Sequence, residues 1–412
     1  MDEDFEEYME FDDEEDSLEL AQTALDRGDD STALDLAEDY LETHPLDVEA
    51  LNICAVAASK LNDEPKALAL YRKALHLDPR NGALHHNYGV LLERLGLYDQ
   101  ALSHFQRSLE LQPDFPEAYI NMGNVLDELG RTEEAVGMYD QALRRMPDAP
   151  DAFYNKGYAL NRLDRFSEAL ECFEKVLAVN PGDAASLNGR GYALSGLGRD
   201  EEALESYCRA ISRDPSVATY RFNRGLSLAR MGRKTDALDD FSTAIASDPA
   251  FFEAYLEKIS LLIEDGEYAA ALPLVDEAQQ LAPQSPEPYF YRGVVLERIG
   301  DMNGALAALD ESLNRDGDSI YTLNNKGNVL MELNRLEEAL GCFDQILQRT
   351  SRYPLAHYNR ACVFARWGKV REAVRALSEA SAQDGRFLDD ARQDPDFDAI
   401  RQTPTFRKLV GA

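Results

Sequence analysis

The stretch GALHHNYGVLLERLGLYDQALSHFQRSLELQPDF, residues 82–115, sets the pattern for almost the whole chain. Its Ala101 recurs every 34 residues without insertion, and Leu or Val always follows it. Eleven positions hold this alanine: Ala33, Ala67, Ala101, Ala135, Ala169, Ala203, Ala237, Ala271, Ala305, Ala339 and Ala373. A fixed period of this length indicates tandem structural repeats. We place the repeat starts at residues 14, 48, 82, 116, 150, 184, 218, 252, 286, 320 and 354.

Two further positions indicate what each repeat is. Position 15 is Gly, Asn or Asp in every repeat, as in Gly96 and Asn62. These residue types readily enter the left-handed backbone region at the end of a helix. Position 32 is Pro in the first eight repeats, as in Pro113, and Pro stops a second helix. Apolar residues between these marks recur at helical spacing, so each repeat is predicted to be helix–turn–helix.

Position 8 predicts how the two helices of a repeat meet. It is Gly in seven repeats, as in Gly89, although Gly inside a helix costs about 1 kcal/mol relative to Ala. We therefore expect a close approach of the helices, with Ala101 as the small residue opposite. Repeat 252–285 departs from this pattern, with Ile259 at position 8 and Pro273 inside the second helix. We predict a local kink or a changed superhelix pitch there.

This pattern resembles that of the tetratricopeptide repeat (TPR) family, which has a small residue at position 8, alanine at 20, an aromatic at 24 and proline at 32. Gly89, Ala101, Phe105 and Pro113 match it residue by residue. The resemblance covers eleven units of 34 residues, or 374 of 412. It implies an all-α fold, a right-handed α-solenoid superhelix of stacked helix–turn–helix repeats whose first helices line a concave groove.

The resemblance also divides the chain. It predicts an acidic disordered tail at 1–13, eleven TPR repeats at 14–387 and a C-terminal capping helix segment at 388–412. Within that cap, Asp394-Pro395 and Thr403-Pro404 predict the starts of two short helices. Four apolar residues would then cover the last repeat: Phe397, Ile400, Phe406 and Leu409.

The composition favours a soluble, cytoplasmic protein. The 76 acidic and 42 basic side chains give a formal net charge of −34, which disfavours nucleic acid and anionic membranes as partners because both need clustered Lys and Arg. No apolar run is long enough to span a membrane, and the acidic start is unlike a signal peptide. Five scattered cysteines predict free thiols in a reducing compartment: Cys54, Cys172, Cys208, Cys342 and Cys362.

The spacing leaves no room for a catalytic domain, because no segment outside the repeats exceeds 25 residues. The repeats contain no phosphate-binding glycine loop and no Cys/His spacing that would ligate a metal. The adjacent residues His85 and His86 point about 100° apart on a helix, so we interpret them as surface residues rather than a metal site. We expect no enzyme activity, no cofactor and no metal.

Position 6 is the strongest candidate for binding. The family geometry directs positions 2, 5, 6, 9, 12 and 13 of the first helix toward the groove. Position 6 is Asn in six repeats: Asn87, Asn121, Asn155, Asn223, Asn325 and Asn359. An amide both donates and accepts, so a row of amides can hold the backbone of an extended peptide. This is similar to the Asn ladder in the TPR superhelix of O-linked N-acetylglucosamine transferase. The alternative is that these amides cap inter-repeat turns or bind water.

Position 5 is aromatic in alternate repeats, and aromatic side chains are typical anchors for a partner's apolar groups. The candidates are Tyr154, Phe222, Phe290 and Tyr358. Packing between neighbouring first helices is the alternative role. Position 13 alternates in sign, as in Glu128 and Arg162, which predicts an internal charge ladder between repeats. Position 7 is basic in seven successive repeats from Lys156, either with stems packed between helices or as a stripe for an acidic partner.

These observations favour a protein–protein interaction scaffold or adaptor that binds an extended peptide segment in the groove. The partners would be one or more proteins with neutral or basic segments, because position 2 is mostly acidic. Position 5 never holds Lys, so we expect no chaperone carboxylate clamp. Three possibilities stay open: a structural subunit that assembles through its terminal caps or convex face, a noncatalytic regulatory subunit of an enzyme, and an acidic tail that occupies the groove. The oligomeric state is undetermined.

Overall fold

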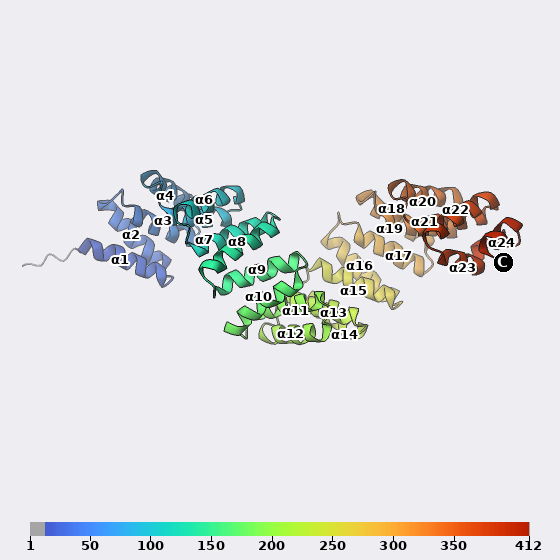
Figure 1. The fold of residues 1–412 in the computed structure, drawn as a ribbon, viewed down its shortest axis with the longest axis horizontal. Coiled ribbons are helices and arrows are strands. Elements are labelled where there is room, and N and C mark those ends of the chain that lie inside the picture. The colour runs from blue at the N-terminus through green and yellow to red at the C-terminus, as the bar shows by residue number, and fades with distance from the viewer. Residues whose placement is uncertain (1–12, 412) are drawn as a thin grey trace, which may run out of the picture. The chain divides into compact units, whose positions relative to one another are not determined.

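The computed structural model describes residues 13–411, which are helical with no strand (Figure 1). The chain divides into two compact units, unit 1 at Met1–Asp214 and unit 2 at Pro215–Ala412. The predicted all-α class is confirmed. No helix among the described residues combines the length and apolar character needed to cross a bilayer.

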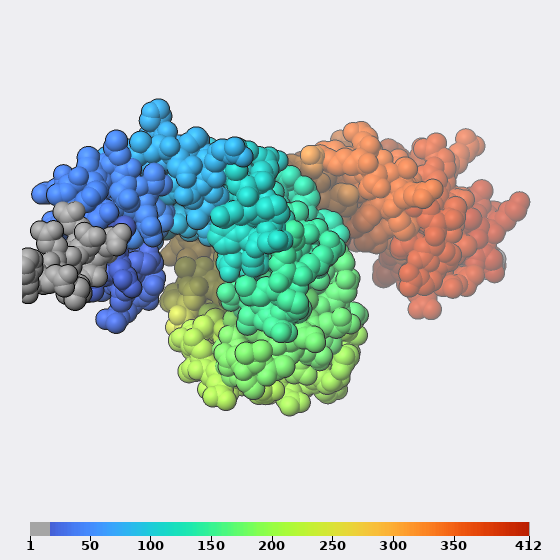
Figure 2. Space-filling view, turned by 60° about the vertical axis from the view of Figure 1, so that its left-hand side comes forward, coloured from blue at the N-terminus to red at the C-terminus, as the bar shows by residue number. Residues whose placement is uncertain are grey.

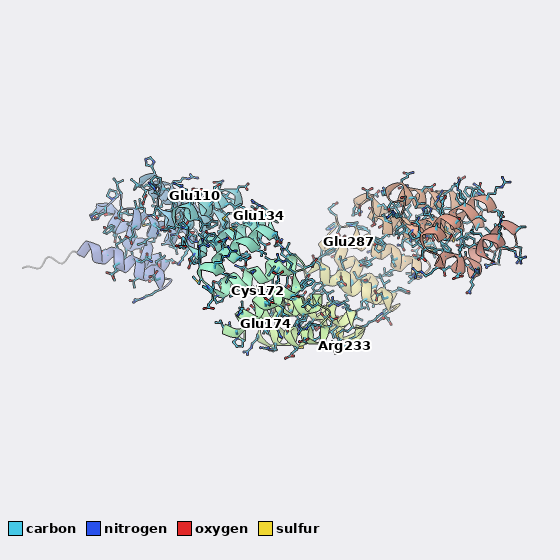
Figure 3. The ribbon with its side chains drawn as sticks, viewed as in Figure 1. Glu110, Glu134, Cys172, Glu174, Arg233 and Glu287 are labelled. Atoms are coloured by element: carbon cyan, nitrogen blue, oxygen red, sulfur yellow. The ribbon has the colours of Figure 1, made fainter. Side chains whose placement is uncertain are left out.

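Unit 1 is a series of paired helices. Their bounds are α1 Asp13–Asp26, α2 Asp30–Thr43, α3 Val48–Lys60, α4 Glu64–Leu77, α5 Gly82–Arg94, α6 Tyr98–Leu111, α7 Pro116–Glu128, α8 Thr132–Arg145, α9 Pro150–Arg162, α10 Phe166–Val179, α11 Ala184–Gly196 and α12 Asp200–Arg213. Figure 2 shows this unit, coloured from blue to green, curving so that one side is hollowed. Acidic side chains such as Glu110, Glu134 and Glu174 extend from its second helices (Figure 3).

Unit 2 continues the same series. Its helices are α13 Ala218–Arg230, α14 Lys234–Ser247, α15 Phe252–Glu264, α16 Tyr268–Leu281, α17 Glu287–Arg298, α18 Met302–Arg315, α19 Ile320–Glu332, α20 Leu336–Arg349, α21 Pro354–Arg366, α22 Val370–Gln383, α23 Arg386–Gln393, the 3₁₀ helix η1 Pro395–Phe397 and α24 Pro404–Val410. Residues 1–12 of the predicted tail lie outside the described part of the chain.

The turn inside each pair has the geometry that position 15 predicts. All eleven residues at this position have positive φ, from 56° at Asp164 to 90° at Gly300. In the third pair, the N–H of Leu97 returns to the carbonyl of Leu92 at 2.8 Å, which satisfies a carbonyl at the helix end. The tight turn lets the second helix pack directly on the first.

The side chain nearest to the glycine at position 8 is the one at position 24, and at Gly293 the carbonyl of Ala305 at position 20 comes next, at 3.4 Å. A Cβ placed on Gly89 would lie 2.7 Å from the ring of Phe105, and one on Gly123 would lie 2.6 Å from Tyr139. The predicted close approach is present, and the ring of Phe105, which the prediction did not name, lies nearest to Gly89. The reason is reach: the ring at position 24 extends across the gap between the helices and fills the space that the missing Cβ leaves.

Repeat 252–285 keeps this fit with the sizes exchanged. Ile259 at position 8 is fully buried in one cluster with Val275 at position 24. A large residue facing a small one fills about the same volume as a glycine facing a ring, and close packing requires that the volume be filled. Helix α16 runs without interruption through Pro273. The kink or pitch change expected here stays a prediction.

The C-terminal segment packs on the last pair of helices. Asp394 caps η1 by accepting from the N–H of Asp396 at 2.9 Å, and Thr403 occupies the N-cap of α24. Phe397, Ile400 and Phe406 are each at most 1% exposed, as a cap requires. Helix α23 was not foreseen, and it begins at Arg386, inside the stretch assigned to the last repeat.

Candidate peptide-binding groove

Most of the predicted position-6 amides bond to the preceding repeat. Four such contacts join neighbouring first helices through the amide nitrogen: Asn87 to Asn52 at 3.0 Å, Asn121 to His86 at 2.9 Å, Asn155 to Asn124 at 2.9 Å and Asn359 to Asn324 at 2.9 Å. The acceptors occupy position 5 or 9 of the repeat before. These bonds form a lateral ladder between first helices, an arrangement that the sequence did not predict, and they are not turn caps.

The six amides differ in what they leave for a partner. An amide nitrogen has two hydrogens, so Asn87, Asn121 and Asn155 each keep a second N–H. Asn359 also donates to Asn328 at 3.2 Å, which uses its second hydrogen. Asn325 bonds the carbonyl of Tyr321 on its own helix at 2.9 Å. Only 9% of the surface of Asn223 is exposed. The three amides of unit 1 therefore stay the best candidates.

The four position-5 aromatics lie in different surroundings. Phe222 packs against Phe241 and Phe251, with ring centroids 5.9 and 4.8 Å away, which fits the packing alternative. Tyr358 is 8% exposed, and its hydroxyl donates to Asp394 at 2.7 Å. The prediction that Tyr358 contacts a peptide is therefore wrong, because the C-terminal segment covers it.

Tyr154 and Phe290 line hollows. Phe290 borders one of about 360 Å³ in unit 2 together with Tyr291 and Tyr321. Tyr154 lines a hollow of about 420 Å³ in unit 1, which we call the acidic hollow. Its lining residues are Glu93, Asn124, Asp127, Glu128, Tyr139, Tyr154, Asn155 and Tyr158.

A second hollow of about 260 Å³ lies in the same unit, and α5 contributes residues to both. We call it the basic hollow, and its lining residues are Val56, Ser59, Lys60, Tyr71, His86, Asn87, Val90 and Arg94. Positions 5, 6, 9, 12 and 13 of the first helices supply most of both linings, as the family geometry implies. Lys60 is 3.3 Å from Asp30 on α2, which partly balances its charge.

Carboxylates dominate the electrostatics of the acidic hollow. Burial, together with the charge of Glu128, raises the pKa of Glu93 to about 7. Arg162 forms an ion pair with Oδ2 of Asp127 at 3.0 Å. The other oxygen of Asp127, Oδ1, is buried and has no hydrogen-bond partner. The side chains of Glu93 and Glu128 form no ion pair or hydrogen bond with any residue in the described range.

The charge ladder predicted along position 13 is present only in places. Arg366 pairs with Glu332 at 2.9 Å, as expected of neighbouring repeats. Arg162 instead reaches Asp127 at position 12, so Glu128 is left without a cation. This difference could have been anticipated from the sequence, because Asp127 at position 12 is a second acid with which Arg162 can pair.

The basic residues at position 7 are largely matched within the protein. Lys156 pairs with Asp140, and Lys326 with Asp310, each at 2.6 Å. In both pairs the aspartate belongs to the second helix of the repeat before. These contacts support the packed interpretation over a stripe for an acidic partner.

His104 was missed from the sequence because it lies on the next helix. Its Nδ1 is 2.9 Å from Nδ1 of His85. Burial lowers the pKa of His104 to about 4, so the ring is neutral near pH 7. The two rings form a hydrogen-bonded contact between α5 and α6.

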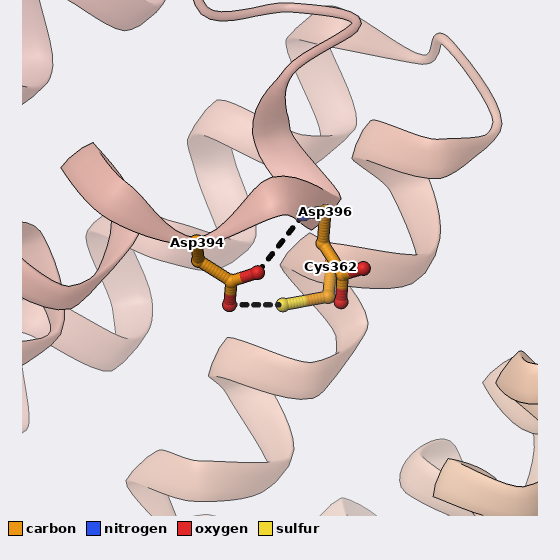
Figure 4. Close-up of side chains that lie close together, drawn as sticks. All are labelled: Cys362, Asp394 and Asp396. Carbon is orange, nitrogen blue, oxygen red and sulfur yellow. Dashed lines mark hydrogen bonds between the residues drawn. The ribbon is translucent and has the colours of Figure 1, made fainter.

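The side chains of Cys362, Asp394 and Asp396 come together where the C-terminal segment meets α21 (Figure 4). Sγ of Cys362 is 3.8 Å from Oδ2 of Asp394. Burial raises the pKa of this thiol well above its usual value, which disfavours the thiolate that a metal would need. Arg366 balances Asp396 at 2.5 Å, and Tyr358 donates to Asp394. We therefore interpret this cluster as a contact that stabilises the packing of the C-terminal segment on the repeats.

Comparisons with solved structures give partial likenesses. MamA from residue 41 onward, from Desulfovibrio magneticus RS-1, is 26% identical over 41% of this chain and 96% of its own, with a TM-score of 0.39. YrrB, described as a TPR protein with an unusual peptide-binding site, is 27% identical over 45% and 95%, with a TM-score of 0.40. Yeast Tom70 is 14% identical over 97% and 99%, with a TM-score of 0.46. No curated protein matches the chain.

All of the family models that match the chain describe the same repeat, and together they cover most of its length. The tetratricopeptide repeat family matches residues 18–82, 81–148, 150–183, 184–217, 222–286 and 324–387. These stretches carry the paired helices, the positive-φ turns and the packing of position 8 on position 24. The chain belongs to the tetratricopeptide repeat family.

Proposed function

We propose that this protein is a noncatalytic scaffold or adaptor that captures an extended segment of a partner protein along unit 1. Membership of the TPR family supports a role in protein interaction. The observation that carries the finer proposal is the pair of hollows in unit 1 that share helix α5, one lined by Asn87 and the other by Asn155. These two amides and Asn121 on α7 each keep an unused N–H.

The amides alone are too weak to hold a partner. A net hydrogen bond contributes about 0.5–1.5 kcal/mol, so three contribute about 1.5–4.5 kcal/mol. A Kd of about 1 μM requires about 8 kcal/mol. Side chains of the partner that enter the two hollows would supply the difference, and the amides would fix the direction of its backbone.

Assembly through the C-terminal cap receives less support. Its apolar residues Phe397, Phe406 and Val410 are buried, and none of the large hydrophobic side chains exposed in the described range falls within α23, η1 or α24. The proposal also includes a cytoplasmic location, because all five cysteines are free thiols, as a reducing compartment maintains.

The test compares partner capture by three forms of the full chain. The double variant Asn121→Ala/Asn155→Ala removes two candidate amides of unit 1. The matched control Asn325→Ala removes an amide at the same repeat position that bonds its own helix. We expect the double variant to lose most of each partner that wild type captures, because the backbone contacts are lost, while the control keeps it.

Quantitative mass spectrometry after capture from native lysate measures this, with circular dichroism to check that helicity is equal. Equal capture by all three forms would reject the groove of unit 1 as the site. It would direct attention to the outer face, and with it to a structural or regulatory subunit.

A further inference from the structure

We infer that the acidic hollow is a subsite for one arginine side chain of the partner segment. The inference rests on the proposed function, since it says which residue of the captured segment the hollow takes. Three observations carry it: the shape of the hollow, the unmatched carboxylates, and the contrast with the equivalent place in unit 2.

The walls of the hollow suit a flat cation. Tyr154 and Tyr158 from α9 meet edge to face, with ring centroids 4.9 Å apart. The hydroxyl of Tyr139 donates a hydrogen bond to Oδ1 of Asn124 at 2.9 Å, which holds this third lining ring in place. Aromatic faces attract cations, and a guanidinium group stacks on them more readily than an ammonium group does.

The carboxylates of the hollow lack a full set of partners. Asp127 uses only Oδ2 in its pair with Arg162, and its Oδ1 is buried and unpaired. Glu93 is half-buried, and Glu128 stands at the exposed rim. Burying a carboxylate without a hydrogen bond or counter-charge is unfavourable, so a cation that enters here would relieve that cost. The forked donors of arginine can reach two of these groups at once.

The same positions recur in unit 2, where two of the three are matched by other residues of that unit. The residues equivalent to Glu93, Glu128 and Tyr154, six repeats later, are Glu297, Glu332 and Tyr358. There Glu332 pairs with Arg366 at 2.9 Å, and Tyr358 donates to Asp394. The counterpart of Asp127 is Met331, which carries no charge. Glu128 and Tyr154 of unit 1 thus lack the partners that Glu332 and Tyr358 have in unit 2, while Glu297, like Glu93, forms no ion pair with any described residue.

The experiment titrates the full chain with N-acetyl-arginine N-methylamide as the probe. The protein carries 3-fluorotyrosine, and the Tyr154→Phe variant assigns the ¹⁹F signal of that ring. We expect the probe to shift the Tyr154 signal in a saturable manner. The citrulline analogue, which has the same shape without the charge, should shift it at least about tenfold less at equal concentration, since a charged hydrogen bond is lost.

Variants test which residues hold the probe. Glu93→Gln/Glu128→Gln should weaken arginine binding by about tenfold, because two of the three carboxylates are removed and the one left, Asp127, already shares its charge with Arg162. These changes remove unmatched charges, so we expect the fold to be retained, which circular dichroism verifies. The matched control Glu297→Gln changes a glutamate at the same repeat position outside the hollow and should leave the titration unchanged.

The titrations can overturn the subsite, its preference for arginine, or the proposed function separately. Equal shifts from arginine and citrulline, or an unchanged titration in the double variant, would overturn the subsite. A lysine probe that binds as tightly as arginine would overturn the preference for a guanidinium group. If the Asn121→Ala/Asn155→Ala variant loses its partners but arginine leaves Tyr154 unaffected, only this inference fails. If arginine binds but the Asn variants capture normally, the proposed function fails instead.

Discussion

At the scale of single residues, the packing of each repeat depends on how position 8 fits position 24. Seven repeats place Gly at position 8, and Phe105 or Tyr139 shows how a ring at position 24 uses the space. Ile259 and Val275 reach the same fit in the opposite order. The pair, not either residue, is what the repeat requires.

This view predicts a compensating pair of substitutions. Gly89→Ile should cost about 1–3 kcal/mol of unfolding free energy or more, because its side chain would overlap the ring of Phe105. Adding Phe105→Val, which copies Ile259 and Val275, should recover at least half of that loss. Urea unfolding followed by circular dichroism measures both. A double variant as unstable as the sum of the two single variants would contradict the fit.

A second residue-level prediction concerns pH. Glu93 binds its proton more tightly in the folded protein, with a pKa of about 7, than its ordinary value of 4.5. Its contribution to stability is therefore fully present below about pH 4.5 and is lost as pH rises through 7. Ionised Glu93 attracts a cation, so binding of the arginine probe should strengthen between pH 6 and 8.

The groups around Glu93 are mostly acidic or aromatic. Glu128 from α7 opposes its ionisation, Asp127 on the same helix has the charge of Arg162 beside it, and tyrosines supply most of the remaining walls. Burial lowers the pKa of His86 below its usual value. Glu93→Gln should therefore remove most of the pH dependence of probe binding. A variant that keeps the wild-type pH profile would assign the titration to another group.

At the scale of helices, the carboxylate of Asp394 connects the C-terminal segment to the last pair of helices. Asp394 accepts from Tyr358 and from the N–H of Asp396, so it joins η1 to α21. Asp394→Ala should lower the stability of this end by about 1–3 kcal/mol, through the lost cap and an unpartnered hydroxyl. Limited proteolysis should then cut residues 394–411 faster than in wild type.

The control for this prediction is Asp398→Ala. Among the described residues its exposed carboxylate pairs with Arg401 alone, and an exposed pair of this kind contributes about 0–1 kcal/mol. Proteolysis of this variant should match wild type. Equal resistance of both variants would mean that apolar burial of Phe397 and Phe406 holds the segment without help from Asp394.

At the scale of the whole molecule, the fold was predictable because a repeat is determined locally. The period of Ala101 gave the pairing of helices, and residues such as Gly96 and Asn62 gave the turns, since both depend on neighbours within 34 residues. The site was less predictable. Amides such as Asn87 bond across repeats, and Tyr358 is covered by residues beyond the array.

The acidic hollow could not be predicted from the sequence either, because it depends on contacts between repeats. It depends on three helices that bring Glu93, Asp127 and Tyr154 together, and on the choice that Arg162 makes between two acids. A pattern read one position at a time shows each residue type but not which groups are left without a partner.

The most direct test of the central claim is site-specific photo-crosslinking in cells. The photoreactive amino acid p-benzoylphenylalanine replaces Tyr154 in the acidic hollow or, as the control, the exposed Glu110 on α6. We predict that position 154 crosslinks a partner through one short stretch, which peptide mass spectrometry would locate on either side of a basic residue, and that position 110 does not. Crosslinks to that partner from position 110 but not from position 154 would contradict capture in the groove of unit 1.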